Sequence, residues 1–539
     1  MKLLGARERR ALSAFALSVA ISVPVVVALP GEPVTTARAE RVATQTAPAA
    51  PPMLPGGPGT DPEEGVALPP AAGAAGVEQR ITQMEAKSAA VTSRPLPDTY
   101  AKGPFVPRPV ADSALPYNSS TVYEVPVDRD ATGVAMYRLP ADGKLYNHPV
   151  HQAEDALAAL NNYRLTGRAA YLNRAVLDAQ RLIDRRVVSD EAWYYPYPYD
   201  FALHGGSDIM RAPWFSGMAQ GQALNVFVRL NRVTGAQKWR DAADATFNSF
   251  RNAPVQGLPS TVHIDGTSNY LWLEEWPRWP PESSDRTFNG HVFAAFGLYD
   301  YLRLTGDPTA VDLWKGALEN ARWQIQYQNR NAGYISSYCL RHPSVLSAKY
   351  HDIHWHQMLS LHASTGDSGW SRISDALRAD YPPPAVSGTV VLMGGSHTGY
   401  RFDKNGAITG HKSITFNRRT SAPGDQRIRI KGRGIYLRIT AGYLAGYLVP
   451  ESYERARFAG VKVQVWYPLS RTVRIPAGTW TAYQYNSAGA VTARKTIRPT
   501  SVTSASFVRS AIIDGRLQVR VTSGTLADYW LPAQGMTLV

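Results

Sequence analysis

Four Thr-Gly turns divide the middle of the sequence into helical hairpins. In each hairpin an apolar-periodic segment of about four turns ends at Thr-Gly, and a second helical segment begins a few residues later. The turns are Thr166-Gly167, Thr234-Gly235, Thr305-Gly306 and Thr365-Gly366. Glycine supplies a left-handed C-cap, and the short connection makes the two helices antiparallel. Because one hairpin cannot bury its apolar faces alone, the repeat predicts an all-α (α/α) barrel or toroid of four hairpins over residues 147–385.

After this region the helical period stops and short alternating runs with Gly and Asn turns predict antiparallel sheet. Residues 400–409 resemble 483–492, and residues 446–450 resemble 528–532. The multidomain chain is therefore predicted to end in two tandem small all-β, sandwich-like units at 386–465 and 466–539.

Before the hairpins, residues 1–39 have the pattern of a signal peptide, with basic residues, an apolar stretch at 11–29 and Ala37-Arg38-Ala39. We expect a secreted, extracellular protein, with retention by an uncleaved N-terminal anchor as the alternative. Residues 40–116 are rich in Pro and Ala and predict a disordered linker. Residues 117–146 predict a short β segment or lid.

The charge balance indicates an acidic partner. The chain has 539 residues, with 57 Lys and Arg against 43 Asp and Glu, a formal charge of +14. No nucleic-acid motif or basic run is present, so an acidic polysaccharide is the expected partner, with cell-wall or membrane-surface association and a dimer left open. The single cysteine, Cys339, excludes an intramolecular disulfide and a cysteine-based zinc cluster.

The repeat also predicts where a site lies. If the Thr-Gly turns share one rim, the N-terminal ends of the leading helices share the other. Gln220 and Asn289 lie at two of these ends, and the loop carrying Glu274 and Glu275 leads into the third helix. Helix N-termini favour a substrate that carries a carboxylate.

Glu274 and Glu275 are enclosed by Trp272 and Trp276. Aromatic surroundings raise the pKa of a carboxyl group and suit it to proton transfer near neutral pH. We expect one of the two glutamates to be a structural partner of a nearby arginine instead.

Tyr338 and Arg341 stand three residues apart, where Arg341 is a candidate clamp for a substrate carboxylate, or alternatively a bridge between helices. Tyr350 and His354 share one helix face, and Tyr350 is a candidate acid or base. His351, His354 and His356 are alternative candidates for metal ligands, but their spacing does not bring all three together, so no metal is predicted.

The aromatic run at 193–199, which includes Tyr195, predicts a stacking surface for sugar rings or a rigid spacer. No phosphate loop, serine elbow or dinucleotide fingerprint is present, which argues against nucleotide, serine-hydrolase and NAD chemistry.

Five ordered motifs resemble the C-terminal catalytic region of D-glucuronyl C5-epimerases, which convert D-glucuronate to L-iduronate in heparan-type polymers (heparan sulfate or heparosan). The motifs are Met-Ala-Gln-Gly-Gln (218–222), Trp-Leu-Glu-Glu-Trp-Pro (272–277), Asn-Gly (289–290) with Phe-Gly-Leu-Tyr-Asp (296–300), Tyr-Cys-Leu-Arg-His (338–342) and Tyr-His-Asp-Ile-His (350–354) with Gln357. The likeness covers about residues 146–381. It implies an (α/α) barrel and a cofactor-free proton exchange at C5 of a uronate.

The resemblance places the catalytic glutamate on Glu275, the catalytic tyrosine on Tyr350, a further active-site tyrosine on Tyr338 and the carboxylate-binding arginine on Arg341. The remaining expected substrate-binding residues are His342, Glu274, Trp276, Asn289, His354, Gln220 and Tyr195. The chain departs from animal members at Trp276, where they have tyrosine, and in a shorter segment from Tyr338 to Tyr350; both departures bear on the polymer more than on the reaction.

Three alternatives stay open from the sequence. A polysaccharide lyase would abstract the same C5 proton and then eliminate the 4-linked group. A glycoside hydrolase would need a second carboxylate opposed to Glu275. A protein that binds acidic polysaccharide without turnover belongs to a different class.

Overall fold

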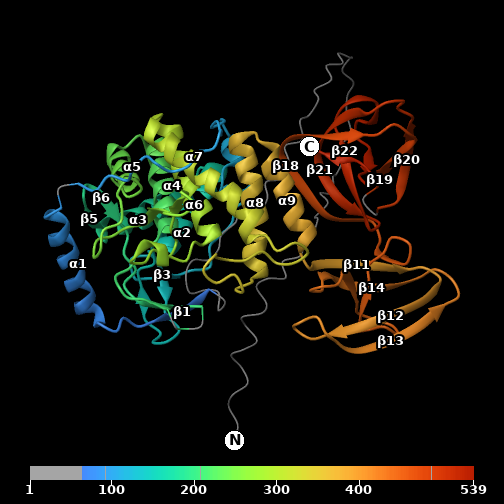
Figure 1. The fold of residues 1–539 in the computed structure, drawn as a ribbon, viewed down its shortest axis with the longest axis horizontal. Coiled ribbons are helices and arrows are strands. Elements are labelled where there is room, and N and C mark those ends of the chain that lie inside the picture. Colours follow the sequence, from blue (N-terminus) through green and yellow to red (C-terminus); the bar gives the residue numbers. More distant parts are fainter. Residues whose placement is uncertain (1–63, 92, 205, 207, 487–488) are drawn as a thin grey trace, which may run out of the picture. The chain divides into compact units, whose positions relative to one another are not determined.

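A computed structural model of the protein describes residues 64–91, 93–204, 206, 208–486 and 489–539 (Figure 1). The predicted signal peptide at 1–39 and the first part of the predicted linker, 40–63, lie outside the described residues.

The prediction of a disordered linker is wrong for residues 64–116. This segment forms strand β1 (Gly65–Leu68), helix α1 (Gly73–Ala89) and a short 3-10 helix, η1 (Asp112–Ala114). Its few large apolar residues, among them Tyr100 and Phe105, are buried in the core of the helical domain. Composition alone was misleading because the segment does not bury a core of its own and instead contributes to that of the following domain.

The predicted β segment at 117–146 is present as a small antiparallel sheet. It contains β2 (Asp128–Arg129), β3 (Ala135–Arg138) and β4 (Leu145–Tyr146). The sheet lies directly before the first hairpin in the chain, and β3 packs on α2, the first helix of that hairpin.

The predicted helical hairpins are confirmed, and there are four in the described chain. They are α2 (Pro149–Thr166) with α3 (Ala169–Asp184), α4 (Gly217–Thr234) with α5 (Gln237–Asn248), α6 (Phe288–Thr305) with α7 (Pro308–Gln324), and α8 (Ala348–Thr365) with α9 (Ser368–Asp380). Each leading helix ends at a glycine in the left-handed region, with φ between 67° and 74°. The N–H of each of these glycines donates to the carbonyl four residues back, which closes the helix and reverses the chain.

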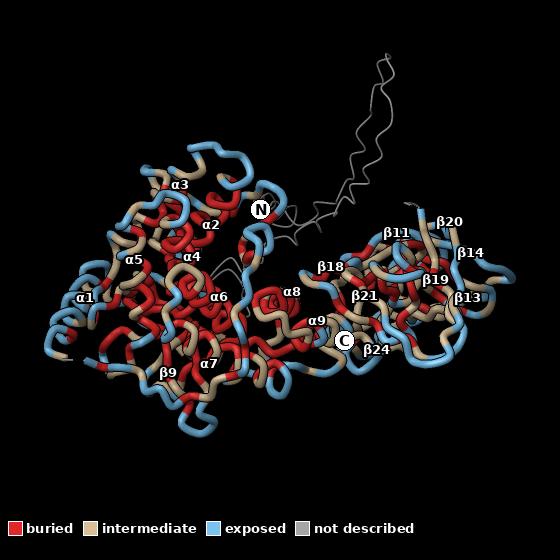
Figure 2. Tube along the Cα trace, turned by 90° about the horizontal axis from the view of Figure 1, so that it is seen from above, coloured by how far each residue is buried: buried red, intermediate tan, exposed pale blue. Residues whose placement is uncertain are grey.

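The leading helices α2, α4, α6 and α8 form the inner layer of the domain and are mostly buried (Figure 2). They pack in chain order, α2 on α4, α4 on α6 and α6 on α8, while the trailing helices α3, α5, α7 and α9 lie outside them. Helices α4 and α6 approach closely at Gly221 and Gly297, where a Cβ added to Gly297 would lie 2.3 Å from the carbonyl oxygen of Gly221. The fold class predicted from the repeat is therefore the one observed.

The connections between hairpins gather at the N-terminal ends of the inner helices. They contain β5 (Val187–Ser189), β6 (Ala192–Tyr194), β7 (Asp200–Leu203), β8 (Asp208–Met210), β9 (Val262–Ile264), β10 (Leu271–Leu273), η2 (Pro281–Ser283) and the π-helix η3 (Ile325–Asn329). The N–H of Gly217, at the start of α4, donates to the carbonyl of Glu274 at 2.6 Å. The N–H of Phe288, at the start of α6, donates to the carbonyl of Tyr338 at 3.1 Å. These bonds fix the predicted site loops to the helix ends.

The C-terminal region contains two antiparallel sheets of seven described strands each, as the tandem repeat predicts. The first holds β11 (Ala385–Leu392), β12 (Gly395–Phe402), β13 (Ile408–Phe416), β14 (Thr420–Arg429), β15 (Ile435–Ile439), β16 (Leu448–Pro450) and β17 (Ala456–Phe458). The second holds β18 (Val461–Ile475), β19 (Trp480–Tyr485), β20 (Val491–Ile497), β21 (Thr503–Ile513), β22 (Arg516–Val521), β23 (Trp530–Pro532) and β24 (Thr537–Leu538).

Equivalent strands occupy equivalent places in the two sheets. The strand orders are β13-β12-β16-β15-β14-β11-β17 and β20-β19-β23-β22-β21-β18-β24, which are the same topology repeated. The boundary between the units lies between Phe458 and Val461, because β18 begins at Val461. The predicted boundary at 465–466 falls inside that strand and is corrected. Among the described residues no helix is long and apolar enough to cross a membrane.

Candidate active site

Two tyrosine hydroxyls converge on one carboxylate. Tyr338 Oη donates to Oε1 of Glu64 at 3.3 Å, and Tyr350 Oη donates to Oε2 of the same residue at 2.6 Å. The ring centroids of the two tyrosines are 4.4 Å apart. Tyr338, Tyr350 and Glu64 are 0%, 2% and 1% exposed. Three segments that are distant in sequence thus form one buried group.

Each of the three is held by a different element. Tyr350 lies in the first turn of α8, and Tyr338 lies in the connection between η3 and α8. Glu64 directly precedes β1, which pairs with β7 in antiparallel register, Gly65 opposite Leu203. The rim predicted from the Thr-Gly repeat therefore does gather the two tyrosines.

Glu275 is the second carboxylate of this site. It is 1% exposed and lies against the first turn of α6, where a Cβ added to Gly290 would be 2.2 Å from its Oε2. Burial raises the pKa of Glu275 well above its usual value, and the charges of Glu64 and Asp285 raise it further. Lys349 and a hydrogen bond with Tyr338 act in the opposite direction. A raised pKa makes the ionised form of Glu275 a stronger base, which suits it to removing a weakly acidic proton.

Lys349 brings a cation to the same place. Its Nζ lies 4.9 Å from the ring centroid of Tyr350, and its charge lowers the pKa of Glu275 and of Glu154. The sequence analysis missed both Lys349 and Glu64. The signal for Lys349 was its place beside Tyr350 in the first turn of a rim helix, whereas Glu64 lies in a Pro- and Ala-rich segment that carries no motif.

Trp276 forms an aromatic wall behind Tyr338. Its Nε1 donates to the hydroxyl of Tyr338 at 3.1 Å, and its ring stacks on Phe201 with centroids 4.7 Å apart. The hydroxyl of Tyr338 accepts this bond, which leaves its own proton to be donated to a neighbouring carboxylate. Burial, followed by the charges of Glu275 and Glu64, raises the pKa of Tyr338 well above its usual value. The hydrogen bond from Trp276 acts in the opposite direction and lowers the pKa of Tyr338, so Trp276 positions the tyrosine while burial and the two carboxylates keep it protonated.

The inner helices add further polar groups to the interior. Each side chain in this set is buried and has a polar atom that makes no hydrogen bond within the described part of the chain. The set is Glu154 on α2, Gln222 on α4, Asn289 on α6, and His354 and Gln357 on α8. Buried polar groups are normally paired, so an unpaired set on facing helices offers donors and acceptors to a hydroxyl-rich ligand. The roles predicted for Asn289 and His354 are compatible with this arrangement and stay predictions.

Burial sets the charge of two of these groups. Burial is the largest of the effects on the pKa of Glu154 and raises it to about 8. It lowers the pKa of His354 well below its usual value, so the imidazole is neutral at physiological pH. His354 Nδ1 lies 2.8 Å from Ser336 Oγ, which leaves Nε2 as its unpaired ring nitrogen.

The two adjacent glutamates have different partners. Glu274 Oε2 accepts from the backbone N–H of Arg286 at 3.1 Å, and Oε1 lies 3.3 Å from Nδ1 of His263. Glu274 is thus bound to the protein on both carboxylate oxygens, and its predicted contact with substrate stays a prediction.

Arg341 has carboxylate partners of its own in the described structure. Its guanidinium forms an ion pair with Asp208 at 3.0 Å and donates to the carbonyl of Ser283 at 2.8 Å. The predicted role of Arg341 as a clamp for a substrate carboxylate stays a prediction.

Gln220 and Tyr195 also have partners of their own. Gln220 accepts from the N–H of Tyr195 at 3.1 Å and donates to Trp193 and Ser249. The hydroxyl of Tyr195 lies 2.5 Å from Thr246 on α5. Both residues join the outer helix α5 to the connecting strands, and their predicted substrate contacts stay predictions. Gln222, two residues further along α4, turns inward instead.

The histidines of α8 do not converge on one point. His351 and His354 both turn Nδ1 toward Ser336 Oγ, at 2.8 Å each, while His356 Nδ1 lies 2.9 Å from the carbonyl of Asp352. His342 lies elsewhere, beside Cys339, Asp285 and His204.

Fold and site together define a helical-hairpin domain whose inner rim holds a buried group of two carboxylates and two tyrosines. Residues 189–378 match the family described as D-glucuronyl C5-epimerase C-terminus. The resemblance drawn from the five motifs is confirmed over these residues, which form a C5-epimerase family domain.

Other comparisons give weaker likenesses. An uncharacterized protein of Methanocaldococcus jannaschii is 22% identical over 189 residues, which are 34% of this chain and 56% of that protein. The chain thus spans about half the length of this curated relative. A cellobiose 2-epimerase of Spirochaeta thermophila has a TM-score of 0.31 at 14% identity, covering 48% of this chain and 63% of that one. A GH76 α-mannanase of Bacteroides thetaiotaomicron has a TM-score of 0.31 at 14% identity, covering 46% of this chain and 62% of that one.

Proposed function

We propose that the chain is an epimerase that inverts C5 of D-glucuronate residues, to L-iduronate, in an acidic polysaccharide. The observation that supports this best is the pair of tyrosine hydroxyls that already hold a carboxylate, that of Glu64, beside Glu275. A uronate carries its carboxylate on C5 itself. A substrate carboxylate in the place of Glu64 would therefore bring C5 next to the acid–base groups.

In the proposed reaction the ionised carboxylate of Glu275 takes the C5 proton from one face. The electron pair moves into the adjoining carboxyl group, and the hydrogen bond from Tyr338 stabilises the resulting enolate. Tyr350 then donates its hydroxyl proton to C5 from the opposite face. The protons on Glu275 and Tyr350 are reset by exchange, so no other reactant is consumed and no cofactor is needed.

Access to the site requires a displacement. Tyr338, Tyr350 and Glu275 are each 2% exposed or less, so a polymer cannot reach them while Glu64 is in place. The substrate carboxylate is proposed to replace that of Glu64 on the tyrosine hydroxyls.

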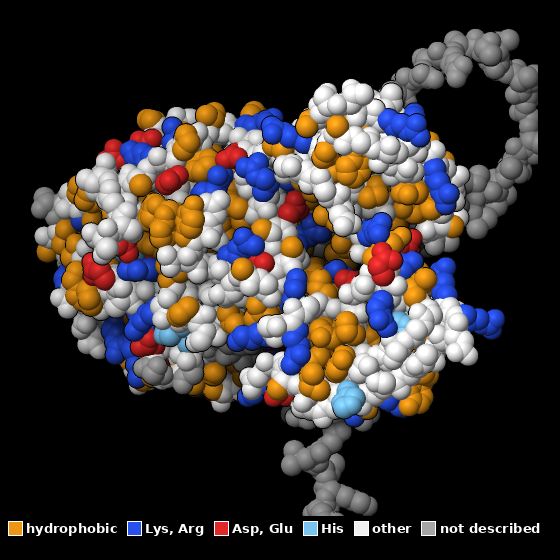
Figure 3. Space-filling model, turned by 45° about the vertical axis from the view of Figure 1, so that its right-hand side comes forward, with side chains coloured by type: hydrophobic (Ala, Val, Ile, Leu, Met, Phe, Trp, Pro, Cys, Tyr) orange, Lys and Arg blue, Asp and Glu red, His pale blue; other side chains and the backbone are white. Residues whose placement is uncertain are grey.

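The charge of the molecule favours an acidic polymer. The formal charge is +14, and Figure 3 shows Lys and Arg side chains spread over one face with only scattered Asp and Glu. Such a surface attracts polyanions before specific contacts form. We further propose that the protein acts outside the cytoplasm, on the basis of the basic and apolar N-terminal sequence.

The experiment is incubation of the full chain with glucuronate-containing polysaccharides in deuterated water. Nuclear magnetic resonance follows deuterium at C5, and ultraviolet absorbance is recorded in parallel. The proposal expects deuterium at C5, iduronate signals and no new absorbance, with Glu275→Gln and Tyr350→Phe each abolishing exchange. Tyr301→Phe is the matched control, because that hydroxyl bonds to Asp244 on α5.

Two results would overturn the proposal. New absorbance from an unsaturated ring would identify a lyase, which uses the same abstraction but eliminates the 4-linked group. Binding of glucuronate polymers without exchange at C5 would identify a non-catalytic binding protein.

A further inference from the structure

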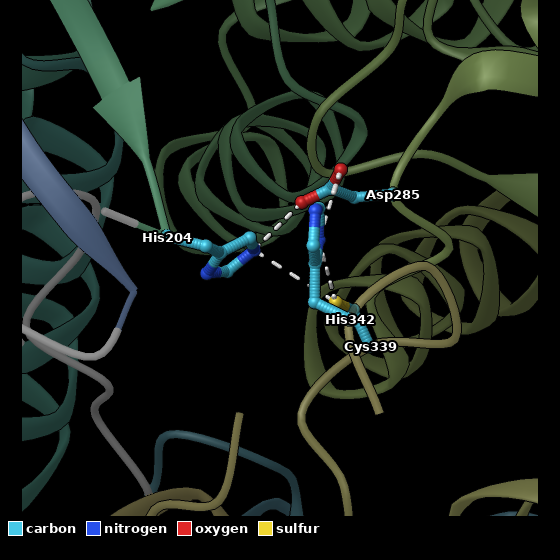
Figure 4. A group of neighbouring side chains, drawn as sticks. All are labelled: His204, Asp285, Cys339 and His342. Atoms are coloured by element: carbon cyan, nitrogen blue, oxygen red, sulfur yellow. Dashed lines mark hydrogen bonds and ion pairs between the residues drawn. The ribbon is translucent and has the colours of Figure 1, made fainter. Parts of the chain in front are cut away.

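Four potential metal ligands from three segments meet beside the candidate active site (Figure 4). His204 follows β7, Asp285 lies in the connection before α6, and Cys339 and His342 lie in the connection before α8. One ligand atom from each lies within 4.8 Å of all the others. The segments of Asp285 and Cys339 run side by side, with an isolated β-bridge between Thr287 and Cys339.

The two imidazoles each turn a single nitrogen toward the shared point. Nε2 of His204 lies 2.8 Å from Asp285 Oδ2 and 3.8 Å from Cys339 Sγ. Nδ1 of His342 lies 3.7 Å from Cys339 Sγ and 3.8 Å from Asp285 Oδ1. A catalytic Cys-His-Asp relay would use the two nitrogens of one ring for two different partners. One nitrogen facing both partners is instead the arrangement of ligands around an ion.

The spacing fits a tetrahedral ion. Ligand atoms about 2.0–2.3 Å from a tetrahedral Zn²⁺ are roughly 3.3–3.8 Å from one another. Three of the four ligand separations given above fall between 3.7 and 3.8 Å. The shorter His204–Asp285 separation would lengthen slightly when both atoms turn to a common ion.

A second observation also indicates a ligand at this point. Oδ1 of Asp285 makes no hydrogen bond among the described residues, although the Asp285 side chain is 0% exposed; Nη1 of Arg341 and Nδ1 of His342 each lie 3.8 Å from it. A buried carboxylate oxygen without a hydrogen bond is costly, and direct coordination to a cation would remove that cost. The side chains of His204 and Asp285 are 3% and 0% exposed and that of His342 is 26% exposed, which leaves an entry path on the His342 side.

We infer that His204, Asp285, Cys339 and His342 bind a divalent transition-metal ion, for which Zn²⁺ is the best fit. Thiolate and imidazole ligands select Zn²⁺ over Ca²⁺ and Mg²⁺, which prefer oxygen. Four protein ligands leave no open position, as in structural zinc sites. The absence of a cysteine-based zinc cluster expected from the single cysteine does not exclude this site, because one thiolate is combined with two imidazoles and a carboxylate.

The ion would act as a positioning element. Cys339 directly follows Tyr338, and His204 directly follows β7, the strand on which β1 is paired. A metal would therefore fasten the segment that carries Tyr338 to the strand that positions Glu64. This inference stands on the ligand geometry and is independent of the proposed epimerase activity.

The test is the metal content of the full chain, purified without chelators and without a histidine tag. We expect about one Zn²⁺ per chain by elemental analysis, falling below about a tenth in Cys339→Ser and His342→Ala. His411→Ala is the matched control, since His411 is an exposed histidine on β13. Circular dichroism of each variant reports whether it folds.

A second measurement keeps the inference testable if the variants do not fold. The wild-type protein is stripped with a chelator and titrated with Co²⁺. The expected result is saturation at one equivalent, with a thiolate-to-cobalt charge-transfer band and the visible bands of a tetrahedral site. Metal at well below stoichiometric amounts with no thiolate band, or metal retained in folded Cys339→Ser and His342→Ala, would overturn the inference.

Discussion

Replacing Glu64 by alanine should make the substrate bind more tightly. Its carboxylate accepts hydrogen bonds of 2.6 Å and 3.3 Å from Tyr350 and Tyr338, and the incoming uronate has to break both. A hydrogen bond to a charged group contributes about 1.5–3 kcal/mol, and every 1.4 kcal/mol changes an equilibrium constant about tenfold. Since the 2.6 Å bond dominates, Glu64→Ala should lower KM by about 10- to 100-fold.

Glu64→Gln gives a graded result. The amide oxygen can still accept from one tyrosine, but the amide nitrogen cannot accept from the other. Its KM should therefore lie between those of the wild type and Glu64→Ala.

The assay is the initial rate of deuterium entry at C5 as a function of oligosaccharide concentration, which separates kcat from KM. Glu78→Ala is the control, because Glu78 is an exposed carboxylate on the same N-terminal segment, paired with Arg185. A Glu64→Ala variant with unchanged KM and a strongly reduced kcat would refute the reasoning. Glu64 would then belong to the proton-transfer groups and would not be a competitor of the substrate.

Three further predictions concern the support of the site. Trp276→Phe removes the 3.1 Å bond to Tyr338 and should slow C5 exchange about tenfold with little change in KM, as followed by the same assay. Gly297→Ala places a Cβ 2.3 Å from a carbonyl oxygen of α4 and should destabilise the protein by about 3 kcal/mol in thermal unfolding; Gly410→Ala, with no atom within 4 Å of the added Cβ, should not. Burial raises the pKa of Glu154 from 4.5 to about 8. Between these two pH values the folded protein keeps the Glu154 proton, whereas the unfolded chain has lost it. The free energy of unfolding should therefore fall as the pH rises from 4.5 to about 8. Glu154→Gln should remove this dependence, with a gain at pH 8 on the order of 4 kcal/mol in unfolding experiments; equal pH dependence in both proteins would contradict it.

The hairpins could be predicted because their signals are local. A Thr-Gly turn needs only a glycine with positive φ and an apolar period on each side, and both are readable over about 20 residues. The tandem β units were found for a related reason, since the same strand order repeats and keeps similar residues at similar places. The exact boundary between the two β units was missed because β17 ends at Phe458 and β18 already begins at Val461, after only a short connection.

The site was only partly predictable. Tyr338, Tyr350 and Glu275 lie at helix ends or in connections that the repeat brings to one rim, so spacing and motif were sufficient to predict that these three residues lie together. Arg341 and Gln220 also lie in the recognised motifs, but the direction of each side chain depends on a partner, Asp208 for Arg341 and Ser249 for Gln220. No pattern along the chain identifies these partners. The metal-ligand group was missed because His204 and Asp285 lie far in sequence from Cys339 and His342.

The position of Glu64 depends on the next residue in the chain, Gly65. Gly65 has a φ of 154°, and a Cβ there would lie 2.4 Å from the carbonyl oxygen of Ala202 on β7. Only glycine lets the backbone lie this close to β7 immediately after the glutamate. From that point β1 continues in register, Gly65 opposite Leu203 through Leu68 opposite Asp200. Asp200 in turn accepts from the N–H of Ala71 at 3.3 Å, just before α1 begins. The carboxylate on the two tyrosines is thus fixed by a strand, a glycine and a turn that all depend on the helical domain. A segment whose composition resembles a linker has local order because it contributes side chains, Glu64 among them, to the interior of another domain.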